Sequence, residues 1–156
     1  MVTRKPSAAK PHTDWLALDN QLCFSLYSAS LAMTKLYKPL LEPLGLTYPQ
    51  YLVMLVLWET DDVTVSAIGE RLHLDSGTLT PLLKRLETAG LLQRERSAED
   101  ERRVHVTLTT SGRRLRERAT QVPQQVFAAS GCGLSELSQL TRQLQRLRDT
   151  LQAALH

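Results

Sequence analysis

The chain of 156 residues has only two thiols, Cys23 and Cys132, and they are its best candidates for covalent chemistry. A thiolate is a nucleophile that peroxides oxidise to a sulfenic acid, whereas a cysteine packed among apolar side chains is inert. Position alone favours the inert interpretation for Cys23, which lies beside the apolar stripe of an expected helix. Cys132 lies between Gly131 and Gly133, so its backbone has the freedom that a thiol needs to approach another sulfur.

Neither cysteine is expected to form a structural disulfide or a metal site. The segment 1–12 lacks the apolar core of a signal peptide and no apolar run reaches membrane length, so we expect a cytoplasmic protein that does not enter a membrane. Structural disulfides are rare in that compartment. Two cysteines and four scattered histidines show no spacing typical of zinc ligands, so we expect no metal and no cofactor.

The stretch 64–109 contains the elements that give the clearest indication of function. A short helix is expected over 66–72 with Thr64 as its N-cap residue, and a turn follows at 73–75. A second helix then carries leucines at helical spacing and ends at Gly90. Its opposite face presents small, hydroxyl and basic side chains, which suit close entry into a major groove of DNA: Gly77, Thr78, Pro81, Lys84, Arg85 and Thr88.

Pro81 leaves two geometries open for this second helix. If Asp75 is the N-cap residue, Pro81 lies past the first turn and removes an internal hydrogen bond. Either the helix kinks at Pro81, or it begins late, at Thr78.

A charged β-hairpin is predicted directly after this pair of helices. Residues 91–96 and 104–108 are expected to be its strands, and the second strand alternates apolar and polar residues. Arg102 or Arg103 at the tip could enter a narrow minor groove, with Asp100 holding the guanidinium in a bidentate pair. The alternative is a solvated hairpin tip, and the preceding helices favour DNA binding.

Long amphipathic helices are predicted on both sides of this unit. One runs over 14–41, and an almost wholly apolar, central helix follows it through Trp58, opened by a capping box of Thr47 and Gln50. After the hairpin, a helix from Thr110 or Ser111 is interrupted or kinked at Pro123, and a last helix is capped by Ser135. That last helix carries a coiled-coil-like seam of Leu137, Leu140, Leu144, Leu147 and Leu151. Such seams suggest a dimer, and the alternative is that the two terminal helices pack on each other within one subunit.

Two motifs give the chain a family resemblance. The hairpin carries Asp100-x-Arg102 followed after five residues by Leu108-Thr109, and the second helix carries DSGTLTPLLKRLE at 75–87. Together they resemble the MarR family of dimeric winged-helix repressors, over nearly the whole chain. The resemblance implies two sets of DNA-binding residues: Ser76, Gly77, Thr78 and Arg85 in the major groove, and Asp100 and Arg102 in the wing. To these we add the basic side chains of Lys84, Arg94 and Arg103.

The expected fold is mainly α, a winged helix-turn-helix with a small β-hairpin wing and long terminal helices that form a dimerisation region. A disordered basic arm at 1–12 precedes a single domain at 13–156, with dimerisation helices at 13–45 and 111–156 and the DNA-binding part at 46–110. The chain has a net charge of +3, yet 64–109 balances seven Lys and Arg with seven Asp and Glu. DNA affinity must therefore depend on where charges are placed, more than on bulk charge.

Within the family the chain is most similar to the OhrR-like branch, which senses organic hydroperoxides. That resemblance implies that Cys23 is the peroxide-reactive thiol and that Tyr27, Tyr37 and Tyr48 surround it as hydrogen-bonding groups. Fourteen residues separate Cys23 from Tyr37, which is about 21 Å on one straight helix. If Tyr37 serves a Cys23 sulfur, it must serve that of the other subunit, whereas Tyr27 is one turn away and can act locally. The resemblance also implies Cys132 as a resolving cysteine that forms a disulfide between subunits.

Three classes of function compete. The first is a homodimeric repressor that binds a palindromic operator in double-stranded DNA and leaves it when an organic hydroperoxide oxidises Cys23. The second is a MarR-like repressor controlled by a bound aromatic or phenolic ligand, with Cys23 inert. The third is a thiol peroxidase, which is disfavoured because no acid–base group accompanies either cysteine in sequence. We predict the first, and not an enzyme.

Overall fold

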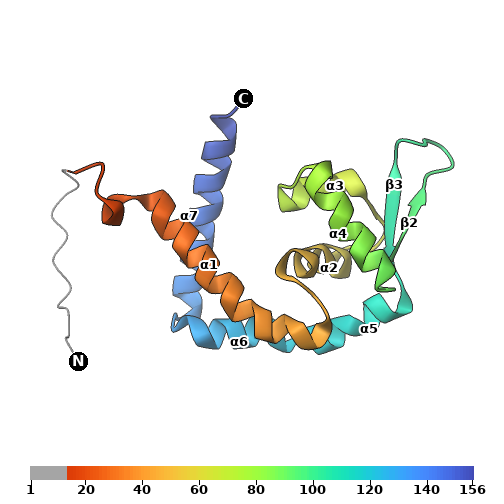
Figure 1. The fold of residues 1–156 in the computed structure, drawn as a ribbon, viewed down its shortest axis with the longest axis horizontal. Helices are drawn as coiled ribbons and strands as arrows, with labels where there is room; N and C mark the ends of the chain where they lie inside the picture. Colours follow the sequence, from red (N-terminus) through yellow and green to blue (C-terminus); the bar gives the residue numbers. More distant parts are fainter. Residues whose placement is uncertain (1–13) are drawn as a thin grey trace.

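The computed structural model describes residues 14–156; the expected basic arm at 1–12 lies outside them. The two long terminal helices, α1 and α7, lie on one side of the molecule and a hairpin projects on the other, with shorter helices between them (Figure 1). In chain order the elements are η1 (Leu18–Asn20), α1 (Leu22–Leu41), η2 (Glu42–Leu44), α2 (Tyr48–Glu59), β1 (Val63–Thr64), α3 (Val65–Leu72), α4 (Ser76–Thr88), β2 (Leu92–Arg96), β3 (Val104–Leu108), α5 (Thr110–Ala119), α6 (Gln121–Ser130) and α7 (Leu134–Ala153).

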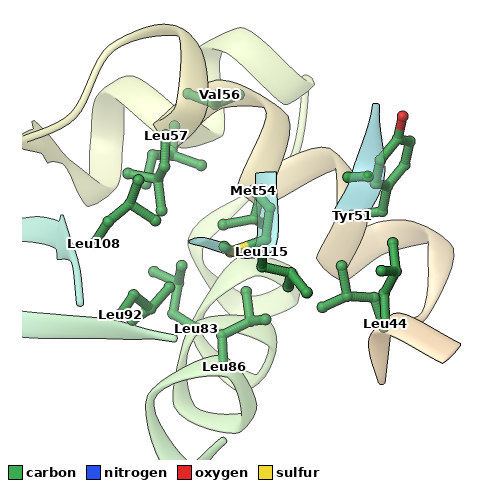
Figure 2. Close-up of a cluster of buried hydrophobic side chains, with 14 of the residues drawn as sticks. Leu44, Tyr51, Met54, Val56, Leu57, Leu83, Leu86, Leu92, Leu108 and Leu115 are labelled. Carbon is green, nitrogen blue, oxygen red and sulfur yellow. The ribbon is translucent and has the colours of Figure 1, made fainter. Parts of the chain in front are cut away.

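Helix α2 lies at the centre of the fold, as its apolar sequence predicts. The expected capping box opens it: the Thr47 backbone N–H donates to Gln50 Oε1 at 3.0 Å, and the Gln50 N–H donates to Thr47 Oγ1 at 3.4 Å. Val53 and Met54 are fully buried among leucines from α4, the hairpin and α5, a cluster shown in Figure 2. This core stabilises residues 64–109, which we call the reading unit.

Helices α3 and α4 form the expected helix-turn-helix. Thr64 caps α3 by accepting from the Ala67 N–H at 3.1 Å, and Asp75 caps α4 by accepting from the Thr78 N–H at 2.7 Å. Helix α4 therefore begins at Ser76, and the late start at Thr78 is wrong. Pro81 lies inside the helix, on its exposed face, where the lost hydrogen bond is tolerated in an otherwise continuous helix.

The hairpin is confirmed and gains a third strand that the sequence did not reveal. The sheet order is β1-β3-β2, all antiparallel, with Val63 opposite Val106 and Leu92 opposite Leu108. Strand β1 has only two residues, too few to produce a detectable alternation. It joins the start of α3 to the base of the wing, so the wing does not stand alone.

The first long helix is shorter than predicted. Helix α1 begins at Leu22, because Asp14 draws the preceding residues into local hydrogen bonds: its carboxylate accepts from the Leu16 N–H at 3.0 Å and its carbonyl accepts from the Asn20 side chain at 2.8 Å. Such side-chain bonds compete with a helical backbone. The residues before α1 form only a 3₁₀ turn.

The C-terminal half departs from prediction in two details. The helix after the wing breaks at Thr120, the residue between α5 and α6, and Pro123 lies in the first turn of α6, where proline is tolerated. Helix α7 begins at Leu134 with Gly133 as its N-cap residue, so Ser135 does not cap it.

Large apolar side chains remain exposed along both terminal helices. Helix α7 buries no residue, and its predicted seam leaves Leu140 46% and Leu151 55% exposed. On α1, Leu22 is 57% exposed and Leu31 48%. Stripes of this kind typically mark an interaction surface. No single described helix has both the length and the apolar character needed to cross a membrane, although 22–44 and 48–59 meet that test jointly as a bent pair.

Candidate nucleic-acid interface and thiol site

The outer face of α4 carries the predicted major-groove residues on the surface of the reading unit. Leu79, Leu82, Leu83 and Leu86 are buried, which fixes the rotation of the helix about its axis. The opposite face is therefore exposed, with these predicted DNA-binding side chains on it: Ser76, Gly77, Thr78, Lys84 and Arg85. A helix with its first residues exposed also offers unpaired backbone N–H groups to a phosphate.

Asp75 sets the start of that face. Hydrogen bonds from the backbone and hydroxyl of Thr78 lower the pKa of the Asp75 carboxyl, so it stays ionised and holds the first turn of α4. Thr78 is thereby fixed at the exposed N-terminal end of the helix.

The wing tip is a tight turn whose charged side chains are exposed. Ser97 N–H donates to the Arg103 carbonyl at 2.8 Å, and Arg103 N–H donates to the Asp100 carbonyl at 2.9 Å. Asp100 accepts from the backbone N–H of Arg102 at 3.1 Å, while the Arg102 Nε lies 3.8 Å from the same oxygen. The expected bidentate pair is therefore wrong: Asp100 shapes the turn, and the Arg102 guanidinium is 95% exposed. It is free to reach a groove.

Arg94 has a different setting from the other predicted DNA-binding residues. Its guanidinium lies 3.2 Å from Glu87 Oε1 and its backbone N–H donates to Glu87 Oε2 at 2.8 Å. The Arg94 side chain is only 24% exposed. Hydrogen bonds from the guanidinium and backbone of Arg94 lower the pKa of the Glu87 carboxyl. The pair joins the end of α4 to the wing, so it sets their relative position.

Cys23 lies on the surface, as the second residue of α1. Its side chain is exposed and free, which overturns the inert, buried interpretation for the single chain. Tyr27 lies one turn further along α1 and is 64% exposed. The start of α1 thus presents a thiol and a phenol in an apolar stripe that the rest of the chain leaves uncovered.

Tyr37, towards the other end of α1, and Tyr48, the first residue of α2, lie in contact with each other and not with Cys23 of the same chain. Their ring centroids are 4.7 Å apart, and Tyr51 joins them at 5.8 Å from Tyr37 and 6.4 Å from Tyr48. Burial, together with the neighbouring Tyr48 and Tyr51, raises the pKa of Tyr37 to about 12, and burial also raises the pKa of Tyr48 and Tyr51. All three phenols therefore stay protonated at neutral pH and can donate hydrogen bonds.

A mostly apolar cavity of about 540 Å³ lies beside Tyr48, between α1 and the start of α2. Leu31 and Leu46 contribute to its walls, and Lys35 and Lys38 lie on its α1 side. Its size and lining suit a small organic molecule.

Cys132 lies in the three-residue link between α6 and α7 and is partly buried. Gly131 adopts φ +68°, a left-handed conformation that ends α6, as glycine permits. The Cys132 N–H donates to Ser130 Oγ at 3.2 Å and its thiol lies 3.6 Å from the Ser130 carbonyl. The thiol is free and tethered only by these weak local contacts.

Two residues that the sequence did not single out contact the predicted ones: Glu87 pairs with Arg94, and Tyr51 lies beside Tyr37 and Tyr48. Trp58 in turn contacts Tyr51, with ring centroids 6.4 Å apart. Tyr51 follows Tyr48 by three residues on α2 and Trp58 follows Tyr51 by seven, so helical spacing alone could have placed all three rings on one face. Glu87 had no comparable signal, because its partner lies across a loop.

Comparisons with known proteins identify the family of this chain. The family model for the transcriptional regulators SarA/Rot matches residues 35–119. The chain is 51% identical over 138 residues to the organic hydroperoxide resistance transcriptional regulator of Bacillus subtilis, covering 88% of this chain and 94% of that protein.

Solved structures of AbfR, a protein of Staphylococcus epidermidis, are similar to this chain in two states. The reduced, DNA-bound form has a TM-score of 0.76 at 38% identity and covers 89% of this chain and 95% of its own. The disulfide form has a TM-score of 0.59 at the same identity, covering 88% and 92%. This chain therefore belongs to the MarR family of winged-helix transcriptional regulators, which are not enzymes, in the branch of the organic hydroperoxide regulators.

Proposed function

We propose that this regulator is a homodimeric repressor that leaves its DNA when an organic hydroperoxide oxidises Cys23. One observation carries the proposal. The reactive thiol and the phenols that would serve it lie at opposite ends of α1, about 21 Å apart along the helix, so one chain cannot form the site. Two chains can, if Cys23 of one protomer meets Tyr37 and Tyr48 of its partner.

The uncovered stripes of α1 and α7 support the dimer. Apolar side chains on two long helices, among them Leu22, Leu31, Leu140 and Leu151, are left in water by the single chain. Each of these four side chains is about half exposed, so covering it would stabilise the assembly by about half of the 1.5–3 kcal/mol that full burial contributes. A two-fold axis would also set two copies of α4 about one DNA turn apart, which fits a palindromic operator in double-stranded DNA.

The sensing chemistry balances with these residues alone. The Cys23 thiolate attacks the distal peroxide oxygen, the O–O bond breaks, and the products are a Cys23 sulfenic acid and an alcohol, with the thiol proton delivered to the alkoxide. Tyr37 and Tyr48 of the partner donate hydrogen bonds that stabilise the Cys23 thiolate. The apolar cavity beside Tyr48 favours organic peroxides over hydrogen peroxide.

Cys132 is the proposed resolving cysteine. Its thiol condenses with the sulfenic acid of the partner's α1, forming a disulfide and releasing water. That bond draws the α6–α7 link towards the start of α1 and rotates the reading units out of groove spacing. The greater likeness of this chain to the reduced, DNA-bound form of AbfR than to its disulfide form supports assigning the described conformation to the DNA-binding state. Because it acts on DNA, we propose that the protein is cytoplasmic.

The serine variants test the redox step. Cys23→Ser should bind operator DNA as the wild type does and remain bound after cumene hydroperoxide, whereas the wild type is released. Cys132→Ser should react at Cys23 but be released less completely. Release of Cys23→Ser by the peroxide, or by a phenolic ligand alone, would refute the proposal in favour of ligand control.

Mixed dimers test the shared site. Chains carrying Cys23→Ser are combined with chains carrying Tyr37→Phe, each with its own affinity tag. In the mixed dimer, the one remaining Cys23 faces an intact Tyr37 only if the tyrosine comes from the partner. Its oxidation rate should then equal the wild-type rate per thiol, and a rate as slow as that of the Tyr37→Phe homodimer would contradict the proposal.

A further inference from the structure

A row of aromatic rings connects the tyrosine pair to the base of the wing. From Tyr37 and Tyr48 the row continues through Tyr51 to Trp58, whose ring centroid lies 6.4 Å from that of Tyr51 at an interplanar angle of 67°. The Trp58 Nε1–H then donates to the Gly112 carbonyl at 2.9 Å. We propose that Tyr51 and Trp58 are positioning residues that transmit the state of the thiol site to the wing. This inference rests on the proposed function.

The first half of the row, from Tyr37 to Tyr51, is tightly packed. Tyr51 is 2% exposed and lies at one edge of the buried cluster drawn in Figure 2. Tyr48 and Tyr51 also lie one turn apart on α2, which its capping box holds. Since packed cores transmit displacement instead of absorbing it, a shift of the Tyr37 and Tyr48 rings on thiol oxidation must displace Tyr51.

The second half ends where the wing is attached. Gly112 lies in the first turn of α5, close to the segment that precedes β2. A Cβ at this position would lie 2.0 Å from the Leu91 carbonyl oxygen. Thr109 binds the same segment, its N–H donating to the Leu91 carbonyl at 3.1 Å and its hydroxyl to the Gly90 carbonyl at 2.6 Å. A displacement of Trp58 therefore moves the start of α5 and the start of β2 together.

The row is selective in what it joins. It begins at the two phenols proposed to serve the thiol and ends at the start of α5, which follows β3 and contacts the segment between α4 and β2. Spatial continuity alone does not demonstrate coupling, so the decisive quantity is the ratio of the DNA dissociation constants of oxidised and reduced protein.

Trp58→Phe is the first variant, because it keeps a ring and removes the N–H donor. Its matched control is Trp15→Phe, which changes a side chain that is 80% exposed before α1. Oxidation should weaken wild-type binding by about 5-fold to 150-fold, the usual range of allosteric coupling. Trp58→Phe should reduce that factor by about fivefold, the contribution of one hydrogen bond, and Trp15→Phe should not change it.

Tyr51 tests the ring contact separately. Tyr51→Phe keeps the ring and should retain the coupling, whereas Tyr51→Leu removes it and should reduce the coupling as Trp58→Phe does. Cys23 oxidation is followed in every variant by intact-protein mass spectrometry, and DNA binding is measured once oxidation is complete, so a change in the rate of oxidation does not alter the ratio of dissociation constants. A general packing defect would instead weaken reduced binding as well, and circular dichroism checks that each variant folds.

Fluorescence gives a direct readout. In a Trp15→Phe background only Trp58 emits, and its emission should change when Cys23 is oxidised; adding Tyr51→Leu should abolish the change. If Trp58→Phe is released from DNA like the wild type, or Trp58 emission does not respond, the relay is overturned and the redox proposal stands. If the wild type itself oxidises without leaving DNA, both fail.

Discussion

The pair of Glu87 and Arg94 offers the sharpest test of how the reading unit is held together. It is the described ion pair that joins α4 to the wing, and it also includes a backbone hydrogen bond to the same carboxylate. Replacing Glu87 by Gln keeps the size and an acceptor oxygen but removes the charge. We expect a less stable protein with a loosened wing.

The magnitude follows from the geometry. Hydrogen bonds to charged groups contribute about 1.5–3 kcal/mol and neutral ones about 0.5–1.5, so losing the charge removes about 1 kcal/mol per bond. The Glu87 side chain is 38% exposed and that of Arg94 24%, so solvent screening reduces the effect. The net loss for E87Q is about 1 kcal/mol, which lowers the thermal midpoint by about 2–4 °C in a chain of this length.

Thermal unfolding of E87Q, Arg94→Gln and the double variant gives the coupling energy between the two side chains. All samples are measured at one protein concentration, because the protein is proposed to dimerise. Glu95→Gln on the same strand is the control, since Glu95 makes no ion pair among residues 14–156. Glu87 has a lowered pKa in the folded protein, so its contribution is complete above the ordinary carboxyl value of 4.5 and disappears as pH falls through the folded value. A drop no larger than that of Glu95→Gln, or additive single effects, would refute the coupling of α4 to the wing.

Three further predictions concern the wing base, the tyrosines and the wing tip. Gly112→Ala forces a Cβ to 2.0 Å from the Leu91 carbonyl and should destabilise by at least about 1–3 kcal/mol in urea unfolding, while Gly133→Ala, with open space around it, should not. The pKa of Tyr37 rises from 10.0 to about 12, so its contribution to stability is complete below pH 10 and is lost as pH rises to 12; Tyr37→Phe should make unfolding midpoints less alkali-sensitive. Arg102→Ala should weaken operator binding and lower the slope of log affinity against log salt by about one, and an unchanged slope would remove Arg102 from the interface.

Local signals in the sequence predicted the reading unit well, because each has a short-range cause. The caps at Thr47, Thr64 and Asp75 are hydrogen bonds between residues three apart, and all three form. The leucine spacing of α4 placed one face in the core and left Lys84 and Arg85 outside. These features need no knowledge of the rest of the chain.

Contacts between distant residues were not predictable in the same way. The two-residue strand β1 forms because Val63 pairs with Val106 on β3. The Arg94 side chain binds Glu87 and is mostly shielded from solvent. The predicted length of the helix over 14–41 is too great, because leucine spacing carries no information about the local hydrogen bonds of Asp14. Spacing predicts the 21 Å separation of Cys23 and Tyr37, whereas the contact of Tyr37 with Tyr51 joins two helices and is found only in the structure.

The most direct test of the account follows mass and DNA binding in one sample. One equivalent of cumene hydroperoxide is added to the operator complex without reductant, and the protein is analysed intact under denaturing, non-reducing conditions while bound DNA is measured. The account predicts a sulfenic acid on Cys23 that converts to a covalent dimer linked through Cys132, with DNA released in step. Release without any change at Cys23, or complete oxidation of Cys23 with DNA still bound, would contradict it.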